Sequence, residues 1–268
     1  MANEFFKSIL AGNNPRMQEG FPRGRSSIFE AIPSMVSMVI NDNMKAIPEE
    51  REIQVAVWSL NSDSAPGPND FPGSFYRASW DLVKNELIQV IQDFFLGGYL
   101  PRVACSTKLV MVPKVKEPNL IQHYHPICMC NFPYKVLASI HNQRIFGSLP
   151  DWIFVEQHGF IKEWSIQGVV SLVQEVIGDI NHKTFCSNMA IKMDMNKAYD
   201  RMELGFIIKL LSYMGFSTWV IDLLFCCFSS FCISTSFMGK QYGFYKAVWG
   251  LRQGTCYPLL FLLLSRIP

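Results

Sequence analysis

The sequence has little charge for its length. Of 268 residues, 17% are charged and 49% are hydrophobic, and the formal net charge at pH 7 is +2. Because charged residues usually make up about 25% of a soluble domain, this composition predicts either membrane contact or apolar faces that further protein should cover. The small net charge neither supports nor excludes a polynucleotide partner, since a local groove can be basic while the total stays near zero.

Zinc-binding and secretory signals are absent as well. None of the eight cysteines forms a Cys-x-x-Cys pair, and no histidine lies at ligand spacing from a cysteine pair, which argues against a zinc site. The first residues lack the apolar stretch of a secretory signal, so we expect an intracellular protein with reduced thiols. Cys226 and Cys227 lie in an apolar helical run and are predicted to fill the core.

One segment, Trp219 to Met238, contains a single charged residue, Asp222. Its second half is rich in serine, threonine and β-branched residues and alternates as a strand does. Two elements within a core are therefore favoured over one membrane span, which stays the alternative.

Periodicity predicts an α+β fold with more helix than sheet. The segment from Ser62 to Ser74 holds three prolines and two glycines and predicts a shaped loop between helices. Helices are expected over 48–61, around 83–94, over 133–147 and 166–180, from 204 to a stop at Gly215, and over 218–229. Strands are expected over 109–112 and 189–194, followed by a hairpin of 231–238 with 242–248.

Charge is concentrated in "KMDMNKAYDRM" (192–202). The pattern predicts a strand, a carboxylate at Asp194, a tight turn and a helix. The backbone N–H groups of the turn could hold phosphate oxygens, and a carboxylate beside them suits a phosphate-bound magnesium ion. The alternative is a surface aspartate that caps the following helix.

Six segments, in this order, resemble motifs of the reverse transcriptase of plant non-LTR (LINE-type) retrotransposons. They are "SAPGPNDF" (64–71), "VPKVKEP" (112–118), "YHPICMCNFPYKVLASI" (124–140), "VEQHGFI" (155–161), "KMDMNKAYDRM" (192–202) and "GLRQG" (250–254). The resemblance covers about residues 45–266. It implies a right-hand polymerase fold with fingers and a partial palm, the thumb being absent. Residues 1–47 would form an irregular N-terminal segment, 48–186 the fingers-like region with part of the palm, and 187–268 the rest of that partial palm.

The resemblance also implies roles for single residues. Asp194 matches a catalytic aspartate that binds Mg²⁺, and Tyr199 a gate that favours deoxynucleotides. Lys114 matches a fingers lysine near the triphosphate, while Gln253 and Gly254 match the loop that positions the incoming nucleotide. The implied partners are an RNA template, a DNA primer and dNTPs, with no membrane. The implied place is the nucleus if the element is active.

Several family positions are changed. The Tyr/Phe-Ala-Asp-Asp hairpin is not reached, so we expect a truncated domain that is inactive as this fragment, because two-metal chemistry needs carboxylates from both sides. His125 replaces an arginine, "KEW" (162–164) replaces Pro-Gly-Arg, Asn69-Asp70 replaces Asp-Gly, and Thr255-Cys256 replaces Asp-Pro. The alternative is a non-catalytic retroelement relic with at most nonspecific nucleic-acid binding.

Overall fold

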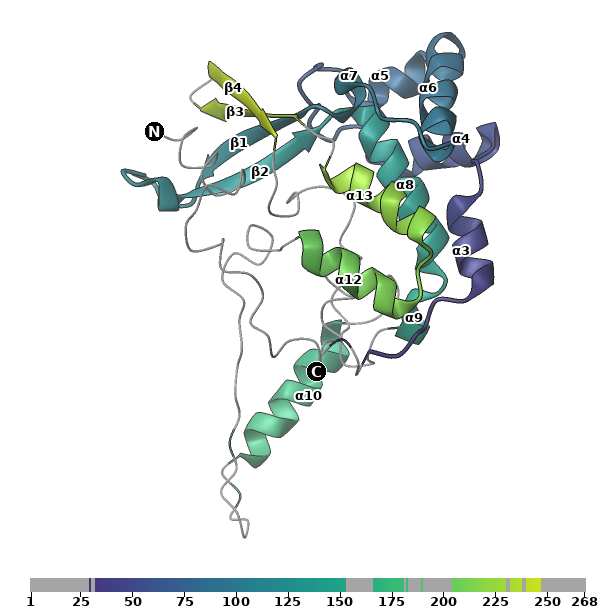
Figure 1. The fold of residues 1–268 in the computed structure, drawn as a ribbon. Helices are drawn as coiled ribbons and strands as arrows, with labels where there is room; N and C mark the ends of the chain where they lie inside the picture. Colours follow the sequence, from purple (N-terminus) through teal and green to yellow (C-terminus); the bar gives the residue numbers. More distant parts are fainter. Residues whose placement is uncertain are drawn as a thin grey trace.

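A computed structural model describes residues 29, 32–152, 166–180, 182, 189, 204–229, 232–237 and 240–246 (Figure 1). It combines a four-stranded sheet with a larger helical region, so the chain has a mixed α+β fold, as predicted. The predicted strand 189–194, the loop 250–254 and the apolar segment 257–268 lie outside these residues, apart from Met189.

The sheet has the strand order β2-β1-β3-β4. β1 (Thr107–Pro113) pairs antiparallel with β2 (Tyr124–Cys130) and parallel with β3 (Cys232–Phe237), which pairs antiparallel with β4 (Lys240–Lys246). β1 alternates: Thr107, Leu109 and Met111 are buried, and the residues between them are half-exposed. Their partners on β2 therefore share this buried face, because directly opposed residues of an antiparallel pair point to the same side.

The helices pack beside and below the sheet in Figure 1. In chain order they are α3 (Met38–Lys45), α4 (Glu50–Ser59), α5 (Gly73–Ala78), α6 (Trp80–Phe95), α7 (Arg102–Cys105), α8 (Phe132–Phe146), α9 (Leu149–Trp152), α10 (Ile166–Asp179), α12 (Leu204–Met214) and α13 (Thr218–Ser229). A short 3₁₀ turn, η2 (Ile121–His123), precedes β2.

α8 is the central helix. It is buried on several sides, with Tyr134, Leu137 and Ile140 all at 2% exposure or less. A helix that is buried on several sides belongs inside a core, and α3, α4, α6 and α7 pack against this one. α10 differs, because it extends away from this core in Figure 1 and Val170, Val176 and Ile177 on it are about half exposed.

The helix predictions for α4, α6, α8, α10, α12 and α13 are confirmed within a few residues, and so are β1 and the β3–β4 hairpin. β4 begins at Lys240, two residues earlier than expected. Trp219 to Met238 is divided between α13 and β3, which confirms two elements in place of one span. Within the described part of the chain, no helix is both long and apolar enough to cross a membrane.

The prediction that residues 1–47 are irregular is wrong for Met38–Lys45, which form α3. Ser37 caps this helix by accepting a hydrogen bond from the Ile40 N–H at 3.3 Å. Asn41 then ties the helix to the turn between α12 and α13: its Nδ2 donates to the Gly215 carbonyl at 2.9 Å, and its Oδ1 accepts from the Ser217 N–H at 2.7 Å. The helix is therefore held by partners about 175 residues away, which local pattern does not reveal.

β2 is a second element that periodicity missed. Its sequence, "YHPICMC", contains a proline, and a proline in a run argues against a central strand. Here β2 lies at the edge of the sheet, where Pro126 pairs with Met111. Such a strand tolerates the missing N–H, because among the described strands β2 has a partner on one side only.

Candidate functional site

The loop between α4 and α5 has a defined shape. The Asp70 N–H donates to the Gly67 carbonyl at 3.1 Å, and Asp70 itself has a φ of 57°, in the left-handed region. The Asn69 Oδ1 accepts a hydrogen bond from the Phe71 N–H at 3.3 Å. Asn and Asp side chains favour such turns because they bond to nearby backbone groups. The shaped loop predicted from the prolines and glycines is thus confirmed.

The start of α8 anchors this loop. The buried Asn131 accepts a hydrogen bond from the Asn69 N–H at 3.1 Å, and its Nδ2 donates to the Val103 carbonyl. A Cβ placed on Gly67 would lie 2.3 Å from the Asn131 Oδ1. Only glycine therefore fits at this point of contact.

Lys135, one helical turn further on, makes the second anchor. Its Nζ donates to the Ser64 Oγ at 3.1 Å and to the Ala65 carbonyl at 2.9 Å. The preceding residue, Tyr134, donates its hydroxyl to the Cys227 carbonyl at 3.0 Å and so links α8 to α13. The segments 64–71 and 124–140, distant in sequence, are thus joined by side chains of the Asn131 to Lys135 turn.

An aromatic cluster lies beneath the loop. Phe71 contacts Phe75 with ring centroids 4.5 Å apart, and Tyr76 stacks on Phe132 at 4.6 Å. Burial raises the pKa of the Tyr76 phenol, while a hydrogen bond with the Asn69 side chain lowers it in part. The loop therefore packs against apolar rings. Phe71, at the edge of this aromatic cluster, is 45% exposed.

Asp70→Gly is expected to stabilise the protein by about 0.5–1 kcal/mol, since glycine adopts a positive φ without the steric cost that Asp70 bears. Urea denaturation of both proteins measures this difference. Asp70→Ala is the matched control, because it removes the same carboxylate and keeps the Cβ. If Asp70→Ala stabilises as much as Asp70→Gly, the carboxylate and not the backbone is the cause.

The β1–β2 hairpin presents the one predicted site residue that the structure describes. Lys114 follows β1 directly, its backbone N–H donates to the His123 carbonyl at 2.7 Å, and its side chain is exposed. His125 sits on β2 opposite Val112 and is half-exposed. The hairpin therefore presents a cationic side chain to solvent at its end, while Pro113 and Tyr124 close the ladder.

The other predicted site residues, Asp194, Tyr199, Gln253 and Gly254, lie outside the described residues. Among the residues that the structure does describe, no group of three or more His, Cys, Asp or Glu side chains is placed to hold a metal ion.

Three residues that shape this region were given no role from sequence: Asn131, Tyr134 and Lys135. The sequence nevertheless indicated this region, because all three residues lie in the segment "YHPICMCNFPYKVLASI". A polar residue directly before an apolar helix is a recognisable cap position. The Asn131 side chain, however, forms its hydrogen bond with the loop and makes no cap hydrogen bond to α8.

Comparison with known proteins gives one distant similarity. No family model matches the chain. A protein of Xenopus laevis described as "Transposon TX1 uncharacterized 149 kDa protein" is 23% identical over 165 residues, which is 62% of this chain and 12% of that protein. The chain thus matches a small part of a much longer relative. This similarity supports an origin of the chain in a transposable element.

Proposed function

We propose that this chain is the fingers and part of the palm of an RNA-directed DNA polymerase from a LINE-type non-LTR retrotransposon. The observation that carries the proposal is the order of the six segments between residues 64 and 254. A single such segment is a weak signal, whereas six in the same order are specific. The similarity to a transposon protein of Xenopus laevis supports the same kind of element.

The packing of two of these segments is consistent with the proposal. Asn131 and Lys135 fix the loop 64–71 against α8, so the two segments act as one unit. Exposed apolar side chains on α10, among them Val173 and Ile177, agree with a domain built to contact further protein.

In the proposed reaction Lys114 contributes charge. Its exposed ammonium group at the end of the β1–β2 hairpin is free to approach an anionic phosphate, and its position is fixed by the bond between its own N–H and the His123 carbonyl. Tyr199 would select deoxynucleotides, and Gln253 with Gly254 would position the nucleotide against the template. These roles follow from the resemblance.

Asp194 is the one residue that the proposal assigns to magnesium binding. The described residues offer no cluster of ligands that fits the ion, so we derive no metal-dependent step. The 268 residues contain no adjacent pair of aspartates. Because two-metal nucleotidyl transfer uses carboxylates from more than one motif, we expect this chain by itself to bind nucleic acid without extending a primer.

A non-catalytic nucleic-acid-binding relic is the second candidate. His125 favours it, since the half-exposed imidazole on β2 stands where the family has arginine. A neutral imidazole lacks the planar, bidentate phosphate grip of a guanidinium.

Binding to a labelled RNA template annealed to a DNA primer tests the proposal. We expect an affinity that falls steeply with salt, because phosphate contacts release counterions. Lys114→Ala should weaken binding about fivefold and make the salt dependence shallower. Lys84→Ala is the matched control, because Lys84 lies on α6 and pairs with Glu50 at 3.5 Å. Binding that ignores salt, or equal losses in both variants, would contradict the role of Lys114.

Primer extension with dNTPs and Mg²⁺ tests whether this chain is active by itself, which would exclude the relic. Asp194→Asn keeps the size of the side chain and removes its charge. Incorporation by the unmodified chain that Asp194→Asn abolishes would identify an active polymerase with Asp194 as its catalytic residue. No incorporation by either protein, together with salt-sensitive binding, is the expected result. Equal incorporation by both would remove Asp194 from the mechanism.

A further inference from the structure

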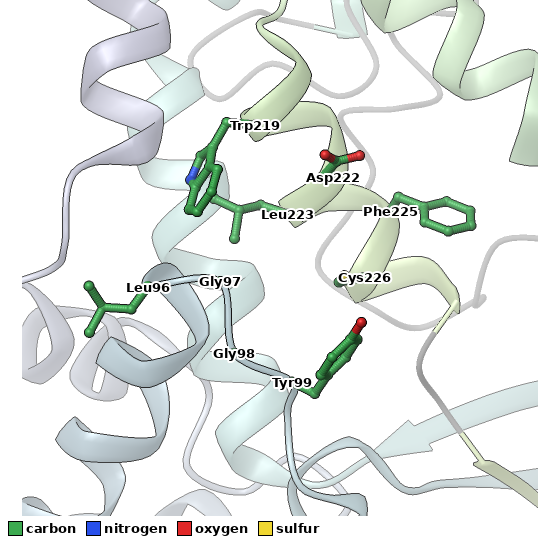
Figure 2. A pocket seen from close by; sticks show the side chains of 9 residues that line it. All are labelled: Leu96, Gly97, Gly98, Tyr99, Trp219, Asp222, Leu223, Phe225 and Cys226. Carbon is green, nitrogen blue, oxygen red and sulfur yellow. The ribbon is translucent and has the colours of Figure 1, made fainter.

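A cavity of about 610 Å³ lies between α13 and the loop that joins α6 to α7. Tyr99 extends from this loop toward α13, whose Trp219, Asp222 and Cys226 line the opposite side (Figure 2). None of these residues belongs to the polymerase-like segments described above. The cavity is therefore a separate feature of the fold.

Glycine makes this cavity possible. Gly97 has a φ of +92°, and a Cβ placed on it would lie 3.1 Å from the Trp219 indole. The loop thus turns sharply against the edge of the indole. Gly97 and Trp219 thus form a closely packed wall of the cavity, and Trp219 as a whole is 46% exposed.

The charge of the cavity is negative. Among the described residues, Asp222 is the one charged side chain that lines it, and it forms no salt bridge with any of them. Burial, and then the nearby Asp222 carboxylate, raise the pKa of the Cys226 thiol. The Cys226 thiol therefore stays neutral, and the Asp222 carboxylate makes the charge of the site negative.

This combination selects a particular ligand chemistry. A carboxylate repels phosphate and attracts cations, while Tyr99 and Trp219 offer aromatic faces on which a cation can stack. A guanidinium suits both features better than an ammonium, since it is planar, weakly hydrated and able to pair with a carboxylate through two hydrogen bonds. Leu96, 61% exposed, and Tyr99, 81% exposed, add an apolar rim for residues that flank such a side chain.

We propose that this pocket binds an arginine side chain presented by a peptide segment of a protein partner. The guanidinium pairs with Asp222 and stacks on Trp219 or Tyr99, and apolar neighbours of the arginine contact the rim at Leu96. This inference does not depend on the proposed polymerase ancestry, because it rests on the charge and shape of the cavity between α13 and the α6–α7 loop.

The probe is the peptide acetyl-Leu-Arg-Leu-amide, titrated into the full chain by ligand-observed NMR. Its matched control replaces arginine with citrulline, which has nearly the same shape and no charge. We expect saturable binding of the arginine peptide with a Kd of about 1 mM or below. The citrulline peptide should bind about tenfold more weakly, since it lacks the charge-assisted pair.

Protein variants locate the site. Asp222→Asn should weaken the arginine peptide about fivefold or more, and Trp219→Leu should weaken it as well. Glu86→Gln removes an exposed carboxylate from α6, away from the cavity lining, and should leave the affinity unchanged. Far-UV circular dichroism checks that each variant keeps the helical content of the unmodified chain.

Three results would overturn the proposal: no saturation by the arginine peptide, equal affinities for the arginine and citrulline peptides, or equal losses in Asp222→Asn and Glu86→Gln. If free arginine amide binds as tightly as the peptide, the rim contributes nothing and the peptide partner is ruled out. The site would then take a small organic cation. Retained selectivity for the peptide supports the proposal as stated.

Discussion

Replacing Arg144 with alanine is expected to lower the free energy of unfolding by about 3 kcal/mol. Arg144 lies near the end of α8 with a side chain only 5% exposed. Its Nε and one terminal nitrogen donate to the two carboxylate oxygens of Glu52 on α4, at 2.7 and 2.8 Å. Removing the guanidinium would leave this half-buried carboxylate without its cation.

Arg144 also donates hydrogen bonds to carbonyl groups at the end of α3. Its other terminal nitrogen donates to the Ala46 carbonyl at 2.6 Å and to the Met44 carbonyl at 3.4 Å. The guanidinium carbon lies 4.8 Å from the centroid of the Phe95 ring on α6. One side chain thus joins four helices, and its loss removes several charge-assisted hydrogen bonds at once.

Two further variants isolate the cause. Arg144→Lys keeps the charge and loses the planar fork, so it should recover only part of the lost stability. Lys84→Ala breaks an exposed pair with Glu50 at 3.5 Å and should cost about 0.5 kcal/mol. Urea denaturation measures all three variants. A loss in Arg144→Ala no larger than that in Lys84→Ala would contradict the proposed anchoring role.

The regular elements could be predicted because their burial is periodic. Leu87, Ile91 and Phe94 recur at helical spacing on α6 and are all at 4% exposure or less. Leu204, Ile207 and Leu211 recur in the same way on α12, at 8% exposure or less, and Gly215 ends that helix with a φ of +97°. Local sequence decides such elements, since one face of each meets the core.

The polar contacts that hold the elements together could not be predicted in this way. Asn41, Asn131 and Arg144 bond to carbonyls or carboxylates whose sequence positions carry no pattern of their own. α3 is held in place by Ser37 and Asn41, although Met38 and Val39 in its first turn are exposed. Polar contacts of long range depend on tertiary packing, which periodicity does not encode.

For the candidate site, the sequence predicted the shape of single segments better than it predicted which residues contact one another. The loop 64–71 was expected to be shaped, yet its anchors Asn131 and Lys135 emerged only from the structure. Lys114 was expected near a triphosphate and is seen as an exposed side chain at the end of the β1–β2 hairpin. The roles of Asp194, Tyr199, Gln253 and Gly254 stay predictions.

Lowering the pH is expected to destabilise the protein through His141. This residue lies on α8 and is 1% exposed, with ring centroids 5.1 Å from Phe95 and 6.4 Å from Phe94. Burial, with a smaller contribution from the positive charge of Arg144, lowers the pKa of His141 from its ordinary value of 6.5 to about 3. The folded protein therefore holds a neutral imidazole at every pH above that value.

The sign of the effect follows from proton binding. Between pH 6.5 and about 3 the unfolded chain binds a proton at His141 and the folded chain does not, so acid favours unfolding. The loss begins as the pH falls through 6.5 and levels off near 3. At pH 5 it should amount to about 2 kcal/mol relative to pH 8.

Two variants distinguish this titration from other acid effects. In His141→Leu the contribution should vanish, so that unfolding free energies measured by urea between pH 8 and pH 5 fall by about 2 kcal/mol less than in the unmodified chain. Ile140→Val, at a neighbouring buried position of α8, should cost about 1 kcal/mol at every pH. A pH dependence in His141→Leu parallel to that of the unmodified chain would mean that another group causes the acid sensitivity. A reduced dependence in His141→Leu, with a parallel shift in Ile140→Val, would identify His141 as its source and place it inside the same α8 core that Arg144 joins to α3 and α4.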